Sequence, residues 1–511
     1  MYYFLPTWQT DIIPWYWMSH RLEFDDTIHQ IRIFQEEKAP TCILLTQYAP
    51  QIRYFLHRQD IFETDLYSVF DEMQQIKETL FLPLQLKDLT WPEDCEFIYT
   101  PFLILVRRQG QVYAHINMGA EGFISEIRFF EMQEISKVMI LDDRGFVSSY
   151  IYYRENQPYY QEYLNPDGVW VFREHFSRQA ARIEVNPVYA SNFERLVYDS
   201  MDTLIREKLT NYFWSQLQYG ATFVVSYSQA NCKLFEYLPK NSPKIMTIYS
   251  EKHQELDMGT LAELLPRLNV LVVDTQDLSR RLCEAFPTYP IKYLPPYDTR
   301  LRLGASQSRK ESKIFYQMGS DPMVDREALS HLLKFMAEHP LLELTVAFYN
   351  AEWQLVQEQE EWVKKFLKEE VEEDQFIRDI DLSAGLENAL AENMERDYRF
   401  EFKNINDENQ LIQELELTRL IIDMSQHPNT YTQIAGISAG IPQINRVSSP
   451  YVEHLKNGYV VATAEEIGAA IDYYTRTLKN WNDSLVYSVQ KISENTGKQF
   501  IKKWENWLKE N

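Results

Sequence analysis

One stretch of this sequence has the spacing of a catalytic serine motif. Gly436, Ser438 and Gly440 match the GxSxG pattern of serine hydrolases, in which the serine stands on a sharp turn between a strand and a helix. His454 follows Ser438 by only about sixteen residues, which is close for a triad base that must lie on a separate loop. Pro442, however, falls where the required helix would have to run, and proline breaks a helix interior. We therefore expect small residues that close a helix against a sheet, rather than a hydrolase.

Other motifs that would indicate chemistry are missing from the sequence. It contains no GxGxxG, GxxxxGK[ST] or HExxH pattern, the signatures of dinucleotide, phosphate and zinc sites. The histidines are scattered, and none pairs with another at the helical spacing of metal ligands. The cysteines form no CxxC pair, which favours buried, reduced thiols over a zinc site or a disulfide framework. These are Cys42, Cys95, Cys232 and Cys283. We expect no catalytic residue, no metal and no cofactor.

The composition of the chain disfavours some classes of binding partner. The 511 residues include only 15 glycines, and loops that cradle phosphates need glycine for close backbone approach. The net charge of −24 repels nucleic acid and anionic membranes and favours basic protein partners. The N-terminus lacks the basic region of a signal peptide. No apolar run reaches the roughly 18 residues that a membrane-spanning helix needs.

The order of predicted elements indicates an α/β protein with a β-rich insertion. Strands at Tyr2–Leu5 and Cys42–Leu45 flank a helix, which is a β-α-β beginning. From Glu96 the apolar period becomes alternating, and turn signals such as Asp142–Gly145 separate short strands. We expect five segments: 1–94, Rossmann-like domain I, first part; 95–182, β-meander insertion; 183–304, domain I, second part; 305–478, Rossmann-like domain II; and 479–511, C-terminal crossover helices.

Three further segments carry structural predictions. Helices are expected at Leu66–Thr79 and Phe193–Leu217 from their apolar spacing. The segment Trp353–Phe376 predicts a helix that ends in a run of acidic residues. Such a run is most simply a solvated helix end, and docking of a basic partner is the alternative.

The stretch from Arg419 to Val461 predicts one βαβ unit. An apolar strand ends at Asp423, a helix runs from Tyr431 to Ala439, and a second strand covers Ile441–Asn445. In open α/β sheets, ligands bind at the loops that follow the carboxyl ends of strands. This loop is therefore the best candidate for a ligand site.

The predicted architecture resembles the GT-B fold of nucleotide-sugar glycosyltransferases. Retaining members carry a Glu-x7-Glu signature that ends in a pattern similar to EAxxxGxP, and an NGxLV segment follows it. Gly440-Ile441-Pro442 matches the GxP, and Asn457–Val461 looks like the NGxLV segment. The resemblance then places the two glutamates at His427 and Ala435. Neither an alanine nor a neutral imidazole can replace a carboxylate acceptor there.

The same resemblance identifies the region that would bind the donor diphosphate. These enzymes use an Arg and a Lys, in a pattern like GRLxxxKG, after the first strand of the second domain. Here the Arg position is Ser320 and the Lys position is Asp325. A carboxylate repels a diphosphate, so the resemblance implies a donor site that has lost its ligand contacts. We do not expect sugar transfer.

The opening MYYFLPTW, the FDDTIHQIRIF helix and the aromatic first loop resemble a particular family over the whole chain. It is the first accessory secretory protein family of the accessory Sec system of Gram-positive bacteria. The resemblance implies a non-catalytic, cytoplasmic component that is peripherally recruited to the cell membrane, which it meets only indirectly through the translocon. The implied partners are two other accessory secretory proteins, a motor ATPase, and glycosylated serine-rich-repeat adhesins delivered to a dedicated translocon.

Two alternatives remain open. The first is an active glycosyltransferase with divergent residues, in which the donor would be served by Glu251, Lys252, His253 or Arg326. The second is a glycan-binding module in which aromatic rings stack on sugars, with core packing as the competing interpretation of the same rings. The candidate aromatics are Trp8, Trp15 and Trp17.

Overall fold

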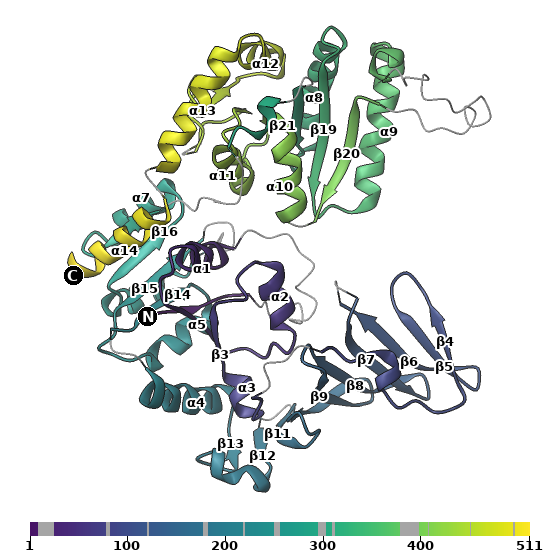
Figure 1. Ribbon diagram of the computed structural model, residues 1–511, viewed down its shortest axis with the longest axis vertical. Helices are drawn as coiled ribbons and strands as arrows, with labels where there is room; N and C mark the ends of the chain where they lie inside the picture. The colour runs from purple at the N-terminus through teal and green to yellow at the C-terminus, as the bar shows by residue number, and fades with distance from the viewer. Residues whose placement is uncertain are drawn as a thin grey trace. The chain divides into compact units, whose positions relative to one another are not determined.

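A computed structural model gives the structure of the chain in two compact units (Figure 1). It describes residues 1–8, 25–77, 82–119, 122–176, 182–217, 220–249, 256–294, 303–308, 312–378, 398–406, 408–449, 451–493 and 496–510. The first unit comprises Met1–His20, Asp26–Leu294 and Trp504–Asn511, and the second comprises Arg21–Asp25 and Pro295–Lys503.

The first unit contains a seven-stranded parallel sheet in the order β17-β16-β15-β14-β1-β2-β3. Its five inner strands are almost entirely buried, as expected of strands covered on both faces, whereas the edge strands β3 and β17 are partly exposed. The strands are β1 (Tyr2–Leu5), β2 (Thr41–Leu45), β3 (Asp65–Ser68), β14 (Thr222–Ser226), β15 (Lys244–Ile248), β16 (Val270–Val273) and β17 (Ile291–Tyr293). The helices are α1 (Asp26–Glu36), α2 (Ile52–Arg58), α3 (Val69–Met73), α4 (Met201–Gln216), α5 (Gln229–Leu234), α6 (Met258–Leu264) and α7 (Gln276–Ala285).

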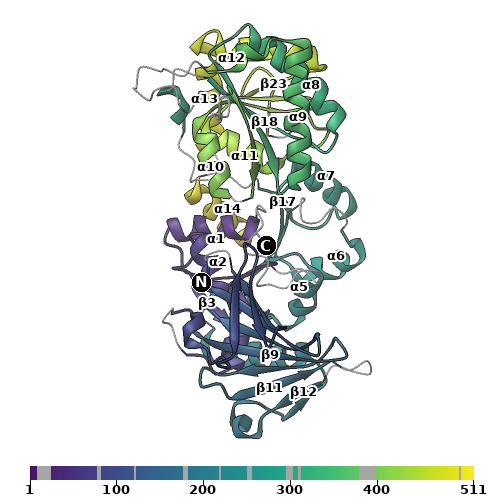
Figure 2. The ribbon, with the colours of Figure 1, turned by 90° about the vertical axis from the view of Figure 1, so that its right-hand side faces the viewer.

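A ten-stranded antiparallel sheet interrupts this unit between α3 and α4, and each strand pairs with the next along the chain. Figure 2 shows β9, β11 and β12 within it. The strands are β4 (Cys95–Tyr99), β5 (Ile104–Arg108), β6 (Gln111–Met118), β7 (Ile124–Glu131), β8 (Glu134–Asp142), β9 (Phe146–Arg154), β10 (Gln157–Leu164), β11 (Trp170–His175), β12 (Arg182–Val185) and β13 (Val197–Tyr198). We call this sheet the insertion sheet.

Two helix predictions are wrong in their extent. The segment expected to be one helix at Leu66–Thr79 contains β3, which joins the parallel sheet beside β2, and only the short α3 follows. The helix expected at Phe193–Leu217 begins at Met201, because Val197–Tyr198 pairs with β12 instead. In both places strand pairing with a distant segment overrides local helical periodicity.

The second unit contains a six-stranded parallel sheet in the order β20-β19-β18-β21-β22-β23. The strands are β18 (Ser312–Gln317), β19 (Leu342–Tyr349), β20 (Phe400–Ile405), β21 (Thr418–Asp423), β22 (Gln443–Asn445) and β23 (Gly458–Val460). The helices are α8 (Pro322–Ala337), α9 (Trp353–Glu370), α10 (Glu408–Leu417), α11 (Thr430–Ala439), α12 (Ile467–Thr475) and α13 (Leu478–Ser493), and α14 (Gly497–Glu510) begins in this unit and ends in the first. Apolar side chains of α8, α9 and α12 pack with those of the sheet as a continuous core.

The structure can be compared with two expectations from the sequence, the burial of the four thiols and the lack of a membrane-spanning helix. Cys42 and Cys232 are buried and Cys95 is half-buried, but Cys283 is exposed, so the expectation of four buried thiols is wrong for that residue. Within the described ranges, no helix combines the length and apolar character needed to cross a membrane.

The end of the chain belongs to the first unit from Trp504 in α14 onward. This indole is fully buried, with its ring centre 5.5 Å from that of Phe34 and 6.5 Å from that of Phe4. Aromatic rings bury large apolar areas and dominate the energetics of such contacts. The last turns of α14 are therefore held by the apolar surface of β1 and α1.

We expect Trp504→Ala to lower the free energy of unfolding of the first unit by about 3–5 kcal/mol, because it leaves a cavity under α14. Urea denaturation of the full chain measures the change. Trp214→Ala is the matched control, since Trp214 on α4 is 88% exposed and its loss should cost less than about 0.5 kcal/mol. Equal effects of the two substitutions would contradict an anchoring role for Trp504.

Candidate functional site

The strand order of the second sheet defines where a ligand would bind. The order reverses between β18 and β21, so the connections that follow these two strands leave toward opposite sides. Such a switch point opens a crevice outside the carboxyl ends of the strands. Gln317 pairs with Asp423, and Asp423 with Asn445, so the ends of β18, β21 and β22 lie level. The candidate site is this carboxyl edge.

Asp423 ends β21 and is turned back onto its own loop. Its carboxylate is buried and accepts hydrogen bonds from the Ser425 amide at 3.0 Å, the Ser425 hydroxyl at 2.5 Å and the Asn429 amide at 2.9 Å. Burial raises the pKa of Asp423, and these donors act in the opposite direction. The carboxylate thus organises the connection to α11 from within.

Asp325 lies in the first turn of α8, across the switch point from Asp423. It is 1% exposed and accepts hydrogen bonds from the Tyr316 hydroxyl at 2.9 Å and the Gly319 amide at 3.0 Å. Burial raises the pKa of Asp325 to about 6, and the nearby charge of Asp423 adds to the shift. A Cβ at Gly319 would lie 3.1 Å from Ser425, so the two loops touch here.

The four positions singled out by the sequence are not equivalent in the structure. Ser320 and His427 are exposed on the loops after β18 and β21, whereas Asp325 and Ala435 are buried. Ala435 lies in the middle of α11, where every residue from Tyr431 to Ala439 is buried. The described side chains at the two strand ends, Gln317 and Asp423, form hydrogen bonds within the chain.

The small residues of α11 serve packing. A Cβ at Gly436 would lie 2.6 Å from the Gln443 amide nitrogen, and Gly440 ends the helix with a φ of 72°. Ser438 lies inside the last turn of the helix, and its buried hydroxyl has no hydrogen-bond partner among the described residues. The His454 Nδ1 accepts the Val460 amide at 3.0 Å. This geometry agrees with the packing interpretation and provides no nucleophile elbow.

The corresponding switch point of the first sheet, between β1 and β14, is also occupied by the chain itself. The Asn231 amide donates to the carbonyl oxygens of Ser226 at 2.9 Å and of Leu5 and Pro6 at 3.2 Å each. Thr7 and Ser226 hydroxyls lie 3.1 Å apart. One asparagine therefore provides hydrogen bonds to carbonyl groups at the ends of both β1 and β14, and these carbonyl groups are not available to a ligand.

The remaining candidates of the sequence fall elsewhere. Trp8 is 5% exposed and its ring centre lies 4.9 Å from that of Phe55, which favours core packing over sugar stacking. Arg326 donates to Gln359 at 3.1 Å and lies over Trp362, facing α9. Trp15, Trp17, Glu251, Lys252 and His253 lie outside the described residues. Across the described part of the chain, no cluster of His, Cys, Asp or Glu has the geometry of a metal site.

Sequence reasoning misses the residues that organise both edges. Apolar periodicity marks Asp423 only as a strand end, although an aspartate that directly follows an apolar strand is itself a signal for this edge. Asn231 and Tyr316 give no signal, because their partners are set by tertiary structure.

Two parallel sheets with this strand order, one of them interrupted by an antiparallel insertion, define a GT-B glycosyltransferase-like protein. The chain superposes on the pneumococcal O-GlcNAc transferase GtfA, solved in complex with UDP and GlcNAc, with a TM-score of 0.67. The match covers 100% of this chain and 98% of that one at 13% identity, and so concerns the fold alone. The predicted fold class is confirmed.

Within this class, the chain belongs to the family of the first accessory secretory protein of the accessory Sec system, whose model matches residues 1–511. A relative from Streptococcus gordonii, which bears the name of that family, is 48% identical over 100% of this chain and 99% of its own length. The crystal structure of accessory secretory protein 1, 2 and 3 in Streptococcus pneumoniae contains a chain that is 40% identical, with a TM-score of 0.87, covering 100% of this chain and 99% of that chain. The family resemblance of the sequence is confirmed.

The raised pKa of Asp325 predicts a pH-dependent loss of stability. A carboxyl that ionises more readily in the unfolded chain stabilises the fold below about pH 4 and loses that contribution as pH rises through about 6. Asp325→Asn keeps one acceptor oxygen for the Gly319 amide, places an NH2 group beside the Tyr316 hydroxyl, and removes the charge. We expect the variant to gain free energy of unfolding relative to the wild type between about pH 4.5 and 6.5, by up to about 3 kcal/mol.

Urea unfolding of the full chain at several pH values measures this difference. Asp321→Asn is the control, because Asp321 caps the same helix from an exposed position. A difference between Asp325→Asn and wild type that stays constant with pH would contradict the assignment.

Proposed function

We propose that this chain is a non-catalytic component of a complex of the accessory Sec system. In this proposal it assembles with two other accessory secretory proteins and helps deliver glycosylated serine-rich-repeat adhesins to a motor ATPase and a dedicated translocon. It acts in the cytoplasm and reaches the membrane through that translocon. Family membership supports the assignment, as does the relative solved together with accessory secretory proteins 2 and 3.

The observation that carries the non-catalytic part of the proposal is the pair of buried carboxyl groups at the second switch point. A sugar-nucleotide diphosphate needs cationic or N–H donors at this edge, since stabilising the leaving group is the main service of such a site. Here Asp325 occupies the first turn of α8, and the Gly319 amide already donates to it. A diphosphate at this point would meet negative charge and few free donors.

We expect isothermal titration with UDP, UDP-GlcNAc and UDP-glucose to give no binding tighter than about 1 mM, a free energy near about −4 kcal/mol. Incubation with each donor and an acceptor peptide should release no UDP. The competing hypothesis, an active glycosyltransferase with divergent residues, requires the opposite result in both measurements. An active GT-B transferase run in parallel confirms that the assays detect binding and turnover.

A second candidate function, recognition of glycans, is favoured by half-buried aromatic side chains on one face of the insertion sheet. The strand registers place Lys137, Tyr152, Tyr160 and His175 in one row across β8 to β11. The neighbouring row holds Met139, Tyr150, Glu162 and Arg173. On the opposite face, Tyr163 and Phe172 belong to the core of the first unit. We call the two rows the tyrosine face.

The tyrosine face combines ring surfaces with paired charges. Tyr152 and Tyr160 stack with their ring centres 4.6 Å apart, and Arg173 donates to Glu162 at 2.6 Å. Burial raises the pKa of both tyrosines, so their hydroxyls stay protonated. Rigid aromatic surface bordered by hydrogen-bonding groups, with Glu162 and Arg173 paired, suits a neutral, hydroxyl-rich ligand such as the sugars of a glycoprotein.

We expect the double substitution Tyr152→Ala and Tyr160→Ala to abolish capture of the glycosylated adhesin segment while the chain stays folded, since stacking surface is lost. A pull-down with glycosylated and unglycosylated segments measures the effect. Tyr99→Ala is the control, because Tyr99 is 71% exposed on β4, away from the tyrosine face. Undiminished capture by the double variant would remove this surface from the proposal without affecting the non-catalytic assignment.

A further inference from the structure

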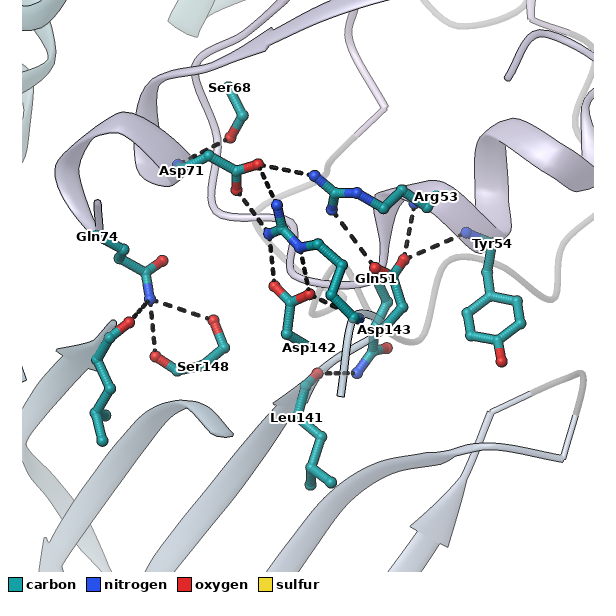
Figure 3. A network of polar contacts seen from close by, with 12 residues as sticks. Gln51, Arg53, Tyr54, Ser68, Asp71, Gln74, Leu141, Asp142, Asp143 and Ser148 are labelled. Atoms are coloured by element: carbon teal, nitrogen blue, oxygen red, sulfur yellow. Dashed lines mark hydrogen bonds and ion pairs between the residues drawn. The ribbon is translucent and has the colours of Figure 1, made fainter. Parts of the chain in front are cut away.

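A largely buried network of charged groups links the insertion sheet to helices of the parallel sheet in the first unit (Figure 3). Arg144, in the turn between β8 and β9, donates to Asp142 at 2.7 and 2.8 Å and to Asp71 of α3 at 2.8 and 3.0 Å. Arg53 of α2 also donates to Asp71, at 2.8 Å. Side-chain exposure is 2% for Arg144 and 1% for Asp142. The network therefore links two helices of the parallel sheet to one turn of the insertion sheet.

Asp143, the remaining member of the network, caps the N-terminus of α2, which belongs to the parallel sheet and not to the insertion sheet. The residue before α2, Gln51, provides no side-chain cap, and its amide instead donates to the Ser125 and Leu141 carbonyls at 3.0 and 2.9 Å. Asp143 takes the capping role and accepts the Arg53 amide at 2.9 Å and the Tyr54 amide at 3.3 Å. The start of α2 thus depends on the β8–β9 turn.

The charges of this junction do not balance. Three carboxyl groups face two guanidinium groups, and Arg144 already forms bidentate pairs with Asp71 and Asp142. Asp143 is the least compensated of the three, since its nearest guanidinium nitrogen, on Arg53, is 3.5 Å away, and its side chain is 0% exposed. An uncompensated buried charge is costly and is avoided by taking up a proton.

The groups around Asp143 come from every element that packs against it. The charged groups that act on Asp143 in the described part of the chain are Arg53 from α2 and Asp142 and Arg144 from its own turn. Asp71 from α3 binds both arginines, and Tyr48 after β2 lies near Asp71 and Asp142. Tyr48 is held neutral because burial raises its pKa. Burial and the charge of Asp142, opposed by the two arginines, together raise the pKa of Asp143 to about 7.

We propose that this junction is a proton-sensitive clamp, closed when Asp143 carries the proton that balances its charges and loosened when that proton is lost. Loosening releases the cap of α2, and α2 follows β2 at the carboxyl edge of the first parallel sheet. The clamp therefore couples the position of the insertion sheet to the edge that carries ligands in this fold class.

The sign of the pH effect follows from the two protonation states. Asp143 titrates near its ordinary pKa of about 4 when the junction is open and near about 7 when it is closed. The closed state is therefore favoured most below about pH 4, and its advantage falls as pH rises through about 7. The opening equilibrium constant should rise about tenfold per pH unit up to about 7 and then level off.

Hydrogen exchange of the full chain, corrected for intrinsic rates and measured from about pH 5 to 8, tests the clamp through peptides that cover α2 and the β8–β9 turn. We expect wild-type protection in these peptides to fall toward about pH 7. Asp143→Asn should show protection that does not change with pH, because an amide still accepts both backbone N–H groups and carries no charge.

Asp257→Asn is the control, since Asp257 caps α6 from an exposed position in the same unit, and its substitution should leave the junction's pH response unchanged. Protection in β14 and β15, two inner strands of the first parallel sheet, reports whether the first unit of each variant is folded. The proposal is overturned if wild-type protection at the junction is the same at about pH 5 and about pH 7.5, or if Asp143→Asn keeps the wild-type slope.

Discussion

A carboxyl group that is buried away from water needs hydrogen-bond donors or a proton. This requirement determines the structure of the loops at the carboxyl edge of the second sheet. Asp423 is given donors by its own loop, and Asp325 by Tyr316 and Gly319. The N–H and O–H groups that bind these two carboxyl groups are therefore not available to a ligand at the carboxyl edge of the second sheet. The carboxyl groups thus stabilise the loops around them and occupy the donors at the same time.

The parts of the fold that sequence can predict are those set by local pattern. The apolar strand ending at Asp423, the helix closed by Gly440 and the strand before Asn445 lie where periodicity and turn chemistry indicate. Gly440 in a left-handed conformation and Pro442 just after it stop a helix in any context. The GT-B class follows from the order of such elements, together with the GxP and NGxLV-like segments.

What sequence could not predict depends on partners far along the chain. β3 forms only because β2 offers an edge, and α2 begins where it does because a turn of the insertion sheet caps it. Asp71 and Arg144 are 73 positions apart, and nothing in either neighbourhood signals their pairing. The Asp142–Gly145 stretch is recognisable as a turn, but its ionic role exists only in the tertiary structure. The candidate site residues are subject to the same limit, since the complete burial of Ala435 within α11 depends on tertiary packing.

Fold and ligand chemistry are separable here because they rest on different residues. The parallel ladders need apolar strands and covering helices, whereas ligand binding needs free donors at the carboxyl edges. In an enzyme, polar groups at those edges lack partners until the ligand binds. This lowers the stability of the fold, a common trade-off between stability and activity. In this chain Asn231 satisfies one switch point, and Asp423 with Asp325 organises the other. An edge closed by its own side chains remains folded without ligand, which agrees with the proposed non-catalytic role.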